Sequence, residues 1–299
     1  MREWAAAGGR RRGRATGLGR GRGQWLCMGR EIGAAGREGA EAAGCEEEGG
    51  AEYKAGFYSM DIRRKCRIYS SSLNYDNEEV HYWRDNFTHY CFPLKDHLLE
   101  LWPEKPIRYR EVVSAYSVEV RKLMLRILDL IREGLGLKLG YFEGELTQNQ
   151  LLSVNYHIPC PNPSLTLGMP QTCDPNLISM LHQCSVPGLQ VLHRGQWMTV
   201  DPMPNAFVLN LGLQFKVISN GKFASPIHRV ITHREEGRTT IATFLIPADD
   251  TFIQPPNKNH AGDDAPLYRC FTYKEFYSTF NKNVSDPDFA LEYFKNSTK

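Results

Sequence analysis

The clearest hydrophobic pattern in the chain is a stripe over residues 109–135. Apolar side chains recur there at spacings of three and four residues, which is the repeat of an amphipathic α-helix. Gly134 and Gly136 end the pattern, as glycines do at helix C-termini. We therefore expect a long scaffold helix that packs on a sheet. The stripe consists of Val112, Val113, Tyr116, Val120, Leu123, Met124, Ile127, Leu128 and Ile131.

After Leu151 the pattern changes to short apolar runs rich in Val, Ile, Leu, Phe and Thr. Turn signals such as Pro187-Gly188 and Asn220-Gly221 separate them, and regular short strands joined by such turns are typical of a sandwich or barrel, including the jelly roll. The expected fold class is mainly β with flanking helices, a jelly-roll core and the long scaffold helix. The predicted strands are 151–158, 177–184, 188–193, 196–200, 206–211, 226–231 and 238–246, and the predicted closing helices are 272–281 and 287–295.

Residues 1–56 carry no hydrophobic periodicity. The first thirty contain eight arginines, eight glycines and one acidic residue, and the stretch that follows is rich in Ala, Gly and Glu. Such a composition cannot offset the entropy of ordering the backbone, so we expect disorder over 1–56. An organelle transit peptide, weak RNA binding and a gene-model artefact are the alternatives. After residue 56 we expect two regions. Residues 57–145 form a helical support region that is truncated relative to the family named below, and residues 146–299 form a jelly-roll domain with C-terminal helices.

Composition narrows the function classes. A chain of 299 residues with 41% apolar content can build one large core, and a net charge of +2 gives no global reason to expect nucleic acid or a membrane surface. The apolar runs are too short to span a bilayer, and no signal peptide follows the early arginines. The eight cysteines form no CxxC pair, which predicts reduced thiols. We expect a cytoplasmic monomer that acts on a small molecule.

The candidate chemistry lies on three of the predicted strands and loops. Asp174 precedes the strand near Leu177, and His228 lies 54 residues later inside another strand. A carboxylate and an imidazole suit a divalent iron that keeps coordination positions open. Arg238 and Thr240 are two residues apart, so they share one face of a strand, and a guanidinium with a hydroxyl suits a dicarboxylate.

Several runs in one order resemble the plant 2-oxoglutarate- and iron(II)-dependent dioxygenases. The finer likeness is to the hyoscyamine 6-dioxygenase-like and downy-mildew-resistance-like groups, and it covers roughly residues 60–297. The runs that carry it include Asn-Tyr-His-Ile-Pro-Cys-Pro-Asn-Pro (155–163), Gln-Thr-Cys-Asp-Pro-Asn-Leu-Ile (171–178), Val-Pro-Gly-Leu-Gln-Val (186–191), Phe-Val-Leu-Asn-Leu-Gly (207–212), Ile-Ser-Asn-Gly-Lys-Phe (218–223), His-Arg-Val-Ile-Thr (228–232) and Phe-Thr-Tyr-Lys-Glu-Phe-Tyr (271–277).

The resemblance implies a double-stranded β-helix with iron held by a His-x-Asp pair and a distal His. It implies Fe(II), 2-oxoglutarate and O2 as participants, and ascorbate as the reductant. Asp174 and His228 match the carboxylate and distal-His positions. Arg238 matches the cosubstrate arginine, and Thr240 replaces the usual Ser. Asn155 matches the Asn of the cosubstrate-binding Asn-x-Tyr.

Two positions depart from the family pattern. Thr172 stands where the first His of His-x-Asp is expected, and a hydroxyl is a poorer ligand for iron(II) than an imidazole. Cys173 cannot substitute for it, because strand alternation points Cys173 away from the face shared by residues 172 and 174. His157 stands where the family has a cosubstrate-binding Tyr. His182 and His233 are expected to be ordinary strand or surface residues.

Three functions follow as alternatives. The first is an active oxygenase that hydroxylates or desaturates a small organic metabolite. The second is a catalytically impaired pseudoenzyme of the same fold that at most binds small molecules or partners. The third is an RNA-associated protein that works through residues 1–30. Phe207, Leu209, Phe244 and Phe252 are candidates for a pocket lining, although core packing is the more common fate of such residues.

Overall fold

Two antiparallel sheets form the centre of the protein. We describe a computed structural model, which covers residues 50–61, 63–70, 80–256, 265–282, 284 and 286–296. The larger sheet has six strands in the order β1-β3-β4-β12-β7-β10. Their bounds are Cys66–Ser70 (β1), Asp85–Phe92 (β3), Asn149–His157 (β4), Arg238–Ile246 (β12), Ile178–Gln183 (β7) and Val208–Leu211 (β10).

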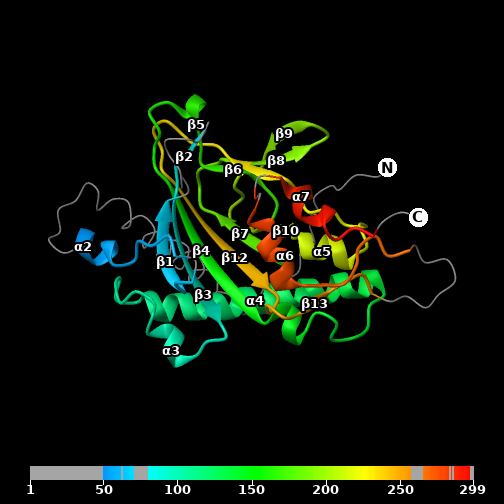
Figure 1. Cartoon of the computed structure of the whole chain (residues 1–299). Helices are drawn as coiled ribbons and strands as arrows, with labels where there is room; N and C mark the ends of the chain where they lie inside the picture. The colour runs from blue at the N-terminus through cyan, green and yellow to red at the C-terminus, as the bar shows by residue number, and fades with distance from the viewer. Residues whose placement is uncertain are drawn as a thin grey trace, which may run out of the picture.

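The smaller sheet has four strands in the order β6-β11-β8-β9 and lies above the larger one (Figure 1). Its strands are Met169–Thr172 (β6), His228–Val230 (β11), Leu189–His193 (β8) and Gln196–Thr199 (β9). Two two-stranded ladders complete the β structure: a parallel one from His81–Tyr82 (β2) and Thr166–Leu167 (β5), and an antiparallel one from Phe252–Ile253 (β13) and Phe271–Thr272 (β14). The predicted jelly-roll class is confirmed.

The long predicted helix is also present, as α4, Tyr109–Leu135. It runs along the outer face of the six-stranded sheet (Figure 1), and Val113, Met124 and Leu128 are completely buried there. Gly136 ends it in the left-handed conformation with φ of 66°, so that its N–H reaches the carbonyls of Arg132 and Glu133. The other helices are α2 (Gly50–Ala55), α3 (Asp96–Leu99), α5 (Leu213–Ile218), α6 (Tyr273–Phe280) and α7 (Pro287–Glu292), with short 3-10 turns at Gly144–Thr147 and Pro163–Leu165.

The two faces of the large sheet differ in chemistry. Leu152 and Val154 of β4 are buried in the hydrophobic core that includes α4. Their neighbours Ser153, Asn155 and His157 are also buried, and alternation places them on the opposite face. Because that face lies toward the four-stranded sheet, the interior between the sheets is polar.

The N-terminal expectations need one correction. Residues 1–49 of the predicted disordered segment lie outside the described residues, but residues 50–55 form α2. The Tyr53 hydroxyl accepts hydrogen bonds from the N–H groups of Glu104 and Lys105, and its ring contacts Phe57. These tertiary contacts order a stretch whose composition alone predicts disorder.

Residues 57–145 contain strands as well as helices. β1 and β3 lie in this region, and β3 pairs with β4 over most of its length, so residues on both sides of 146 contribute to one sheet. Six cysteines lie in the described part of the chain, and all six are free thiols.

A buried histidine in β3 generates the first prediction. His89 Nε2 lies 2.6 Å from the Tyr109 hydroxyl oxygen, and Nδ1 lies 3.0 Å from the carbonyl oxygen of Tyr90. Burial lowers the pKa of His89 to about 4, so the folded protein holds it neutral at pH 5 while the unfolded chain protonates it. Stability is therefore full above the unfolded pKa and falls as the pH drops from about 6.5 towards 4, by about 2 kcal/mol between pH 7 and pH 5.

Urea unfolding at pH 7 and at pH 5 measures this loss. The control is His89→Gln, which has no titrating imidazole at this position and should show about 2 kcal/mol less pH dependence. Equal pH dependence in the two proteins would show that His89 is not the group that titrates.

Candidate active site

Asp174 and His228 meet between the two sheets. Asp174 follows β6, and His228 begins β11, the strand that pairs with β6. His228 Nε2 lies 3.8 Å from Asp174 Oδ1, which is too long for a hydrogen bond. Two ligands of one ion, each about 2.0 to 2.2 Å from it, lie about 3 to 4 Å apart. The separation therefore suits a shared cation.

Both side chains are held in place from behind. Asp174 Oδ2 accepts hydrogen bonds from Ser179 Oγ at 2.7 Å and Asn210 Nδ2 at 3.3 Å. The Nδ1 of His228 lies 3.0 Å from the carbonyl oxygen of Pro226. Because a carbonyl can only accept, Nδ1 carries the proton and the Nε2 lone pair faces Asp174. The pair is thus oriented as two metal ligands.

Thr172 occupies the place where a third ligand would be. It lies directly opposite His228 in the β6–β11 pairing. Its hydroxyl donates to the carbonyl oxygens of Cys173 and Val284, each at 3.2 Å. No group of three or more His, Cys, Asp or Glu side chains with metal-binding geometry exists in the described part of the chain. The strong donors at this point are therefore Asp174 and His228.

The other nearby donors point elsewhere. The Cys173 thiol is buried on the far side of the strand, 3.5 Å from the Ser225 carbonyl oxygen that accepts from it. His233 Nε2 lies 2.7 Å from the carbonyl oxygen of Pro187. His182, from β7, packs its ring 5.8 Å from that of Phe207.

Arg238 is a buried cation held by neutral groups. Only 2% of it is exposed, and burial lowers its pKa to about 10, so it stays charged at neutral pH. Its Nε donates to the Val186 carbonyl at 3.2 Å, and its Nη2 donates to Gln183 Oε1 at 2.9 Å. Among the described residues it has no carboxylate partner. A buried guanidinium in such surroundings favours an anionic ligand.

The hydroxyl of Thr240, oriented by Asn155, adds a donor on the face of β12 that carries Arg238. Asn155 Nδ2 donates to Thr240 Oγ1 at 3.3 Å, and the two residues are partners in the β4–β12 register. The Thr240 oxygen is an acceptor in this bond, so its own proton can be donated to a ligand. Arg238 and Thr240 therefore form a donor pair beside one another on β12.

His157 lies next to Arg238 and differs from the tyrosine that the resemblance implies. Its pKa is lowered well below the usual range by burial first and then by the charges of Arg238 and Arg84. A hydrogen bond to the backbone of Trp83 uses one ring nitrogen, and Nδ1 is buried without a partner. Neutral His157 thus presents an acceptor, where a tyrosine hydroxyl presents a donor.

Gly168 makes room for the His157 ring. A side-chain carbon at Gly168 would lie 2.5 Å from His157 Nδ1 and 2.9 Å from a methyl group of Val230. The backbone between β5 and β6 therefore passes closely over the His157 ring.

Sequence reasoning missed the residues that support the site. Ser179 and Gln183 lie in the predicted strand 177–184 and share the face that points at Asp174 and Arg238. Asn210 is the one polar residue of the apolar run Val208–Leu211. Polar residues on one face of otherwise apolar strands were the available signal. Of the predicted pocket candidates, Phe207 and Leu209 pack against the core, and Phe252 is 69% exposed.

Comparison with known proteins identifies the family. Residues 148–247 match the model of the 2OG-Fe(II) oxygenase superfamily. The chain is 45% identical over 244 residues to hyoscyamine 6-dioxygenase of Hyoscyamus niger, which covers 81% of this chain and 71% of that protein. It is 40% identical over 256 residues to Protein DOWNY MILDEW RESISTANCE 6 of Arabidopsis thaliana, covering 81% and 75%. The chain belongs to the 2OG-Fe(II) oxygenase superfamily.

Solved structures agree with this assignment. The crystal structure of JOX2 in complex with 2OG, Fe and JA superposes with a TM-score of 0.67 at 29% identity, covering 82% of this chain and 76% of that one. The structure of a dioxygenase for auxin oxidation in rice gives a TM-score of 0.64 at 22% identity, which shows the shared fold, covering 85% and 87%.

The residues present fit the two family cofactors unequally. Arg238 and Thr240 fit the far carboxylate of 2-oxoglutarate, because both offer donors and the guanidinium has no anionic partner among the described residues. The iron position fits less well, since it offers one carboxylate, one imidazole and a hydroxyl already directed at backbone carbonyls. The donors present thus fit a dicarboxylate more completely than they fit a metal ion.

The hydrogen bond from Ser179 to Asp174 leads to a testable prediction about metal affinity. Ser179→Ala removes the shorter of the two hydrogen bonds to Asp174 Oδ2, so Mn(II) should bind about tenfold more weakly. Titration followed by the electron paramagnetic resonance of free Mn(II) measures this. Ser153→Ala is the matched control, because Ser153 lies on the same face and bonds Asn86. Equal losses in the two variants would mean that Ser179 does not act through Asp174.

Proposed function

We propose that this protein binds 2-oxoglutarate between its two sheets but holds Fe(II) through Asp174 and His228 alone, so that oxygenase turnover is impaired. The observation that carries the proposal is Thr172, which faces His228 across β6 and β11 with its hydroxyl bonded to backbone carbonyls. The protein is in this account a catalytically impaired pseudoenzyme of its family.

The loss of an imidazole ligand has a large expected effect. Disturbing a residue that merely orients a ligand already lowers metal affinity about 10- to 100-fold. Removing the ligand itself removes a nitrogen lone pair that suits iron(II), and a hydroxyl is a poor replacement. The remaining pair would hold Fe(II) only at high concentrations of the metal.

The cosubstrate subsite supports the other half of the proposal. Arg238 and Thr240 would hold the far carboxylate of 2-oxoglutarate, and Gln183 would keep the guanidinium in place. Asn155 would orient the Thr240 hydroxyl. His157 Nδ1 is buried against Gly168 and carries no proton to donate, so His157 would add less than the tyrosine of the family pattern.

An active oxygenase is the second candidate. It is favoured by the intact support of the metal pair, since Ser179, Asn210 and the Pro226 carbonyl still orient Asp174 and His228. The curated relatives named above include a dioxygenase. In this case Fe(II), 2-oxoglutarate and O2, with ascorbate as reductant, would serve the hydroxylation or desaturation of a small organic metabolite.

The remaining expectations stay proposals. We propose a monomer of the cytoplasm with a small-molecule ligand and no nucleic-acid partner. The RNA-binding alternative rests on residues 1–30, which lie outside the described residues. None of the helices in the described ranges combines the length and apolar character that crossing a bilayer requires.

The proposal predicts the effect of restoring the ligand. Thr172→His should raise the affinity for Fe(II) by roughly 100-fold or more, because it returns an imidazole to the strand position opposite His228. Anaerobic titration with Fe(II) and 2-oxoglutarate, followed by the visible charge-transfer band, measures the binding. Succinate formation in air should then appear in the variant at least tenfold above the native chain.

Thr172→Val is the matched control. It keeps the shape of Thr172 without the hydroxyl, so it should bind Fe(II) as the native chain does if the hydroxyl is no ligand. Succinate formation by the native chain at the rate of Thr172→His would contradict the pseudoenzyme and favour the active oxygenase.

The cosubstrate half of the proposal is tested separately. Arg238→Met should weaken 2-oxoglutarate binding by about two orders of magnitude, because it leaves the far carboxylate of bound 2-oxoglutarate without a cationic partner. Calorimetric titration of 2-oxoglutarate in the presence of Mn(II) measures it. Unchanged affinity in Arg238→Met would show that the dicarboxylate binds elsewhere.

A further inference from the structure

A second polar subsite lies beside the proposed 2-oxoglutarate site, on strands β3 and β4. Asn86 of β3 is 3% exposed. Its Nδ2 donates to Ser153 Oγ at 2.6 Å and to Asn155 Oδ1 at 2.7 Å. Its Oδ1 is buried and has no hydrogen-bond partner. A buried acceptor without a donor is costly, so this oxygen calls for a donor that the protein does not supply.

The orientation of the Asn86 amide follows from its neighbours. Asn155 Oδ1 also accepts from Arg84 Nη1 at 3.0 Å, while Asn155 Nδ2 donates to Thr240. Asn155 Oδ1 is therefore an acceptor, and the group of Asn86 that faces it must be the NH2. The unpartnered atom of Asn86 is thus the carbonyl oxygen.

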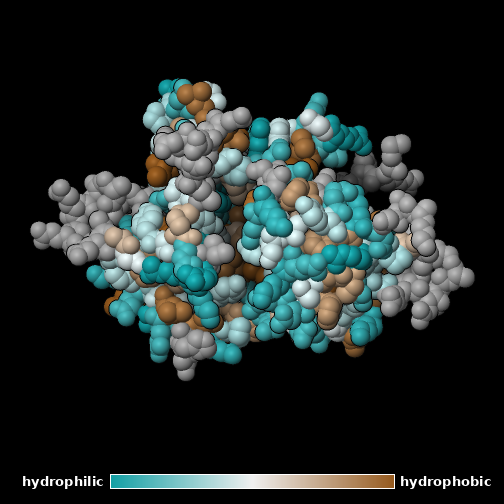
Figure 2. Space-filling model, in the orientation of Figure 1, coloured by the Kyte–Doolittle hydropathy of each residue, from teal (hydrophilic) through white to brown (hydrophobic). Residues whose placement is uncertain are grey.

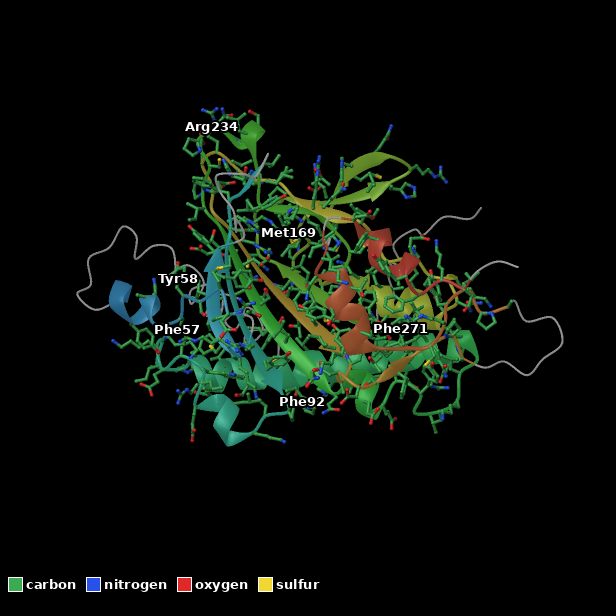
Figure 3. The ribbon with its side chains drawn as sticks, in the orientation of Figure 1. Phe57, Tyr58, Phe92, Met169, Arg234 and Phe271 are labelled. Carbon is green, nitrogen blue, oxygen red and sulfur yellow. The ribbon has the colours of Figure 1, made fainter. Side chains whose placement is uncertain are left out.

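Asn86 points to the interior between the sheets. Its neighbours along β3, Phe87 and His89, lie on the opposite face with Tyr109 of α4. On the inner side, Arg84 also approaches the sulfur of Met169 on β6 at 3.4 Å, and Met169 is labelled in Figure 3. Asn86 is therefore one strand away from Asn155 and two strands away from Thr240.

A groove lies in the surface beside β1 and β3. Figure 2 shows the face of the protein hollowed between the side that carries β1 and β3 and the side that carries α6, with hydrophobic residues at its bottom. Tyr69 of β1 is the register partner of Asn86 and shares its face. Tyr277 of α6 is close enough to Tyr69 for their hydroxyls to interact electrostatically. Tyr69 therefore lies across the β1–β3 pairing from Asn86, with Tyr277 near Tyr69.

We propose that Asn86 Oδ1 anchors the organic substrate or ligand of this protein, and that this ligand is a small ring compound carrying a hydroxyl or amino hydrogen-bond donor. Ser153 and Asn155 hold the amide from the side, so the acceptor is oriented before the ligand arrives. Tyr69 beside Asn86 suits a ring compound. The single buried acceptor favours a ligand with a hydrogen-bond donor over its alkylated analogue. The inference rests on the proposed function, since it takes the space between the sheets to be a ligand site.

Matched fragment pairs test this selection. Benzyl alcohol against benzyl methyl ether, and aniline against N,N-dimethylaniline, differ in the donor and keep the ring. Ligand-observed saturation-transfer NMR titrations with the full chain should show each donor-bearing member binding roughly fivefold more tightly than its partner. Asn86→Leu should abolish that preference. Thr88→Val changes the next inward-facing residue of β3, whose hydroxyl donates to the Leu152 carbonyl and not to Asn86, and should retain it.

A second readout needs no variant. The ¹³Cγ resonance of the Asn86 carboxamide should move on addition of benzyl alcohol and stay in place with its methyl ether. No preference in the native chain, no saturable binding of the donor-bearing fragments, or a preference that survives in Asn86→Leu would overturn the inference. The first of these results would mean that ordered water alone serves Asn86 Oδ1.

The titrations are carried out with and without 2-oxoglutarate so that the two proposals can fail separately. Fragment discrimination without 2-oxoglutarate binding would refute the proposed function and support the Asn86 subsite. Binding of 2-oxoglutarate without discrimination between the fragments would refute the Asn86 subsite and leave the proposed function standing.

Discussion

The buried carboxylate of Asp174 is the constraint on which the centre of this protein depends. A carboxylate removed from water must be hydrogen-bonded or paired with a cation. Ser179 from β7 and Asn210 from β10 supply two donors to one oxygen, and the other oxygen is left facing His228 of the opposite sheet. These contacts lie where the chain passes from β6 of the small sheet to β7 of the large one, so Asp174 connects the two sheets.

The polar interior contains two proposed subsites, and they match the family pattern to different degrees. The proposed dicarboxylate subsite has the cation Arg238, the hydroxyl donor Thr240, and Gln183 and Asn155, which orient them. The metal subsite has the oriented Asp174–His228 pair but not the third strong donor, since the Thr172 hydroxyl is directed at the carbonyls of Cys173 and Val284. On our proposal, an intact scaffold around an incomplete metal position lets membership of an oxygenase family coexist with impaired turnover. The strands around this position pair with threonine at residue 172, β11 lying between β6 and β8.

Much of this arrangement could be read from the chain alone. Strong periodicity predicted α4 to the residue, and alternating apolar runs predicted seven strands within a few residues. The likeness of short runs to a family predicted that Asp174, His228 and Arg238 belong to one site, and the first two lie 3.8 Å apart. Ser179, Gln183 and Asn86 were missed because their roles come from cross-strand neighbours, which depend on register. The order of residues 50–55 was missed because it depends on Tyr53 reaching Glu104 and Lys105, a contact far apart in sequence.

The central claim is that a single imidazole faces the metal position, and proton NMR of the Co(II)-loaded native chain tests it directly. A ligating histidine whose other nitrogen keeps its proton gives one strongly shifted, solvent-exchangeable signal. The account predicts one such signal, from the Nδ1 proton of His228 that the Pro226 carbonyl holds, and its loss in His228→Ala. Two shifted exchangeable signals, or one that persists in His228→Ala, would contradict it.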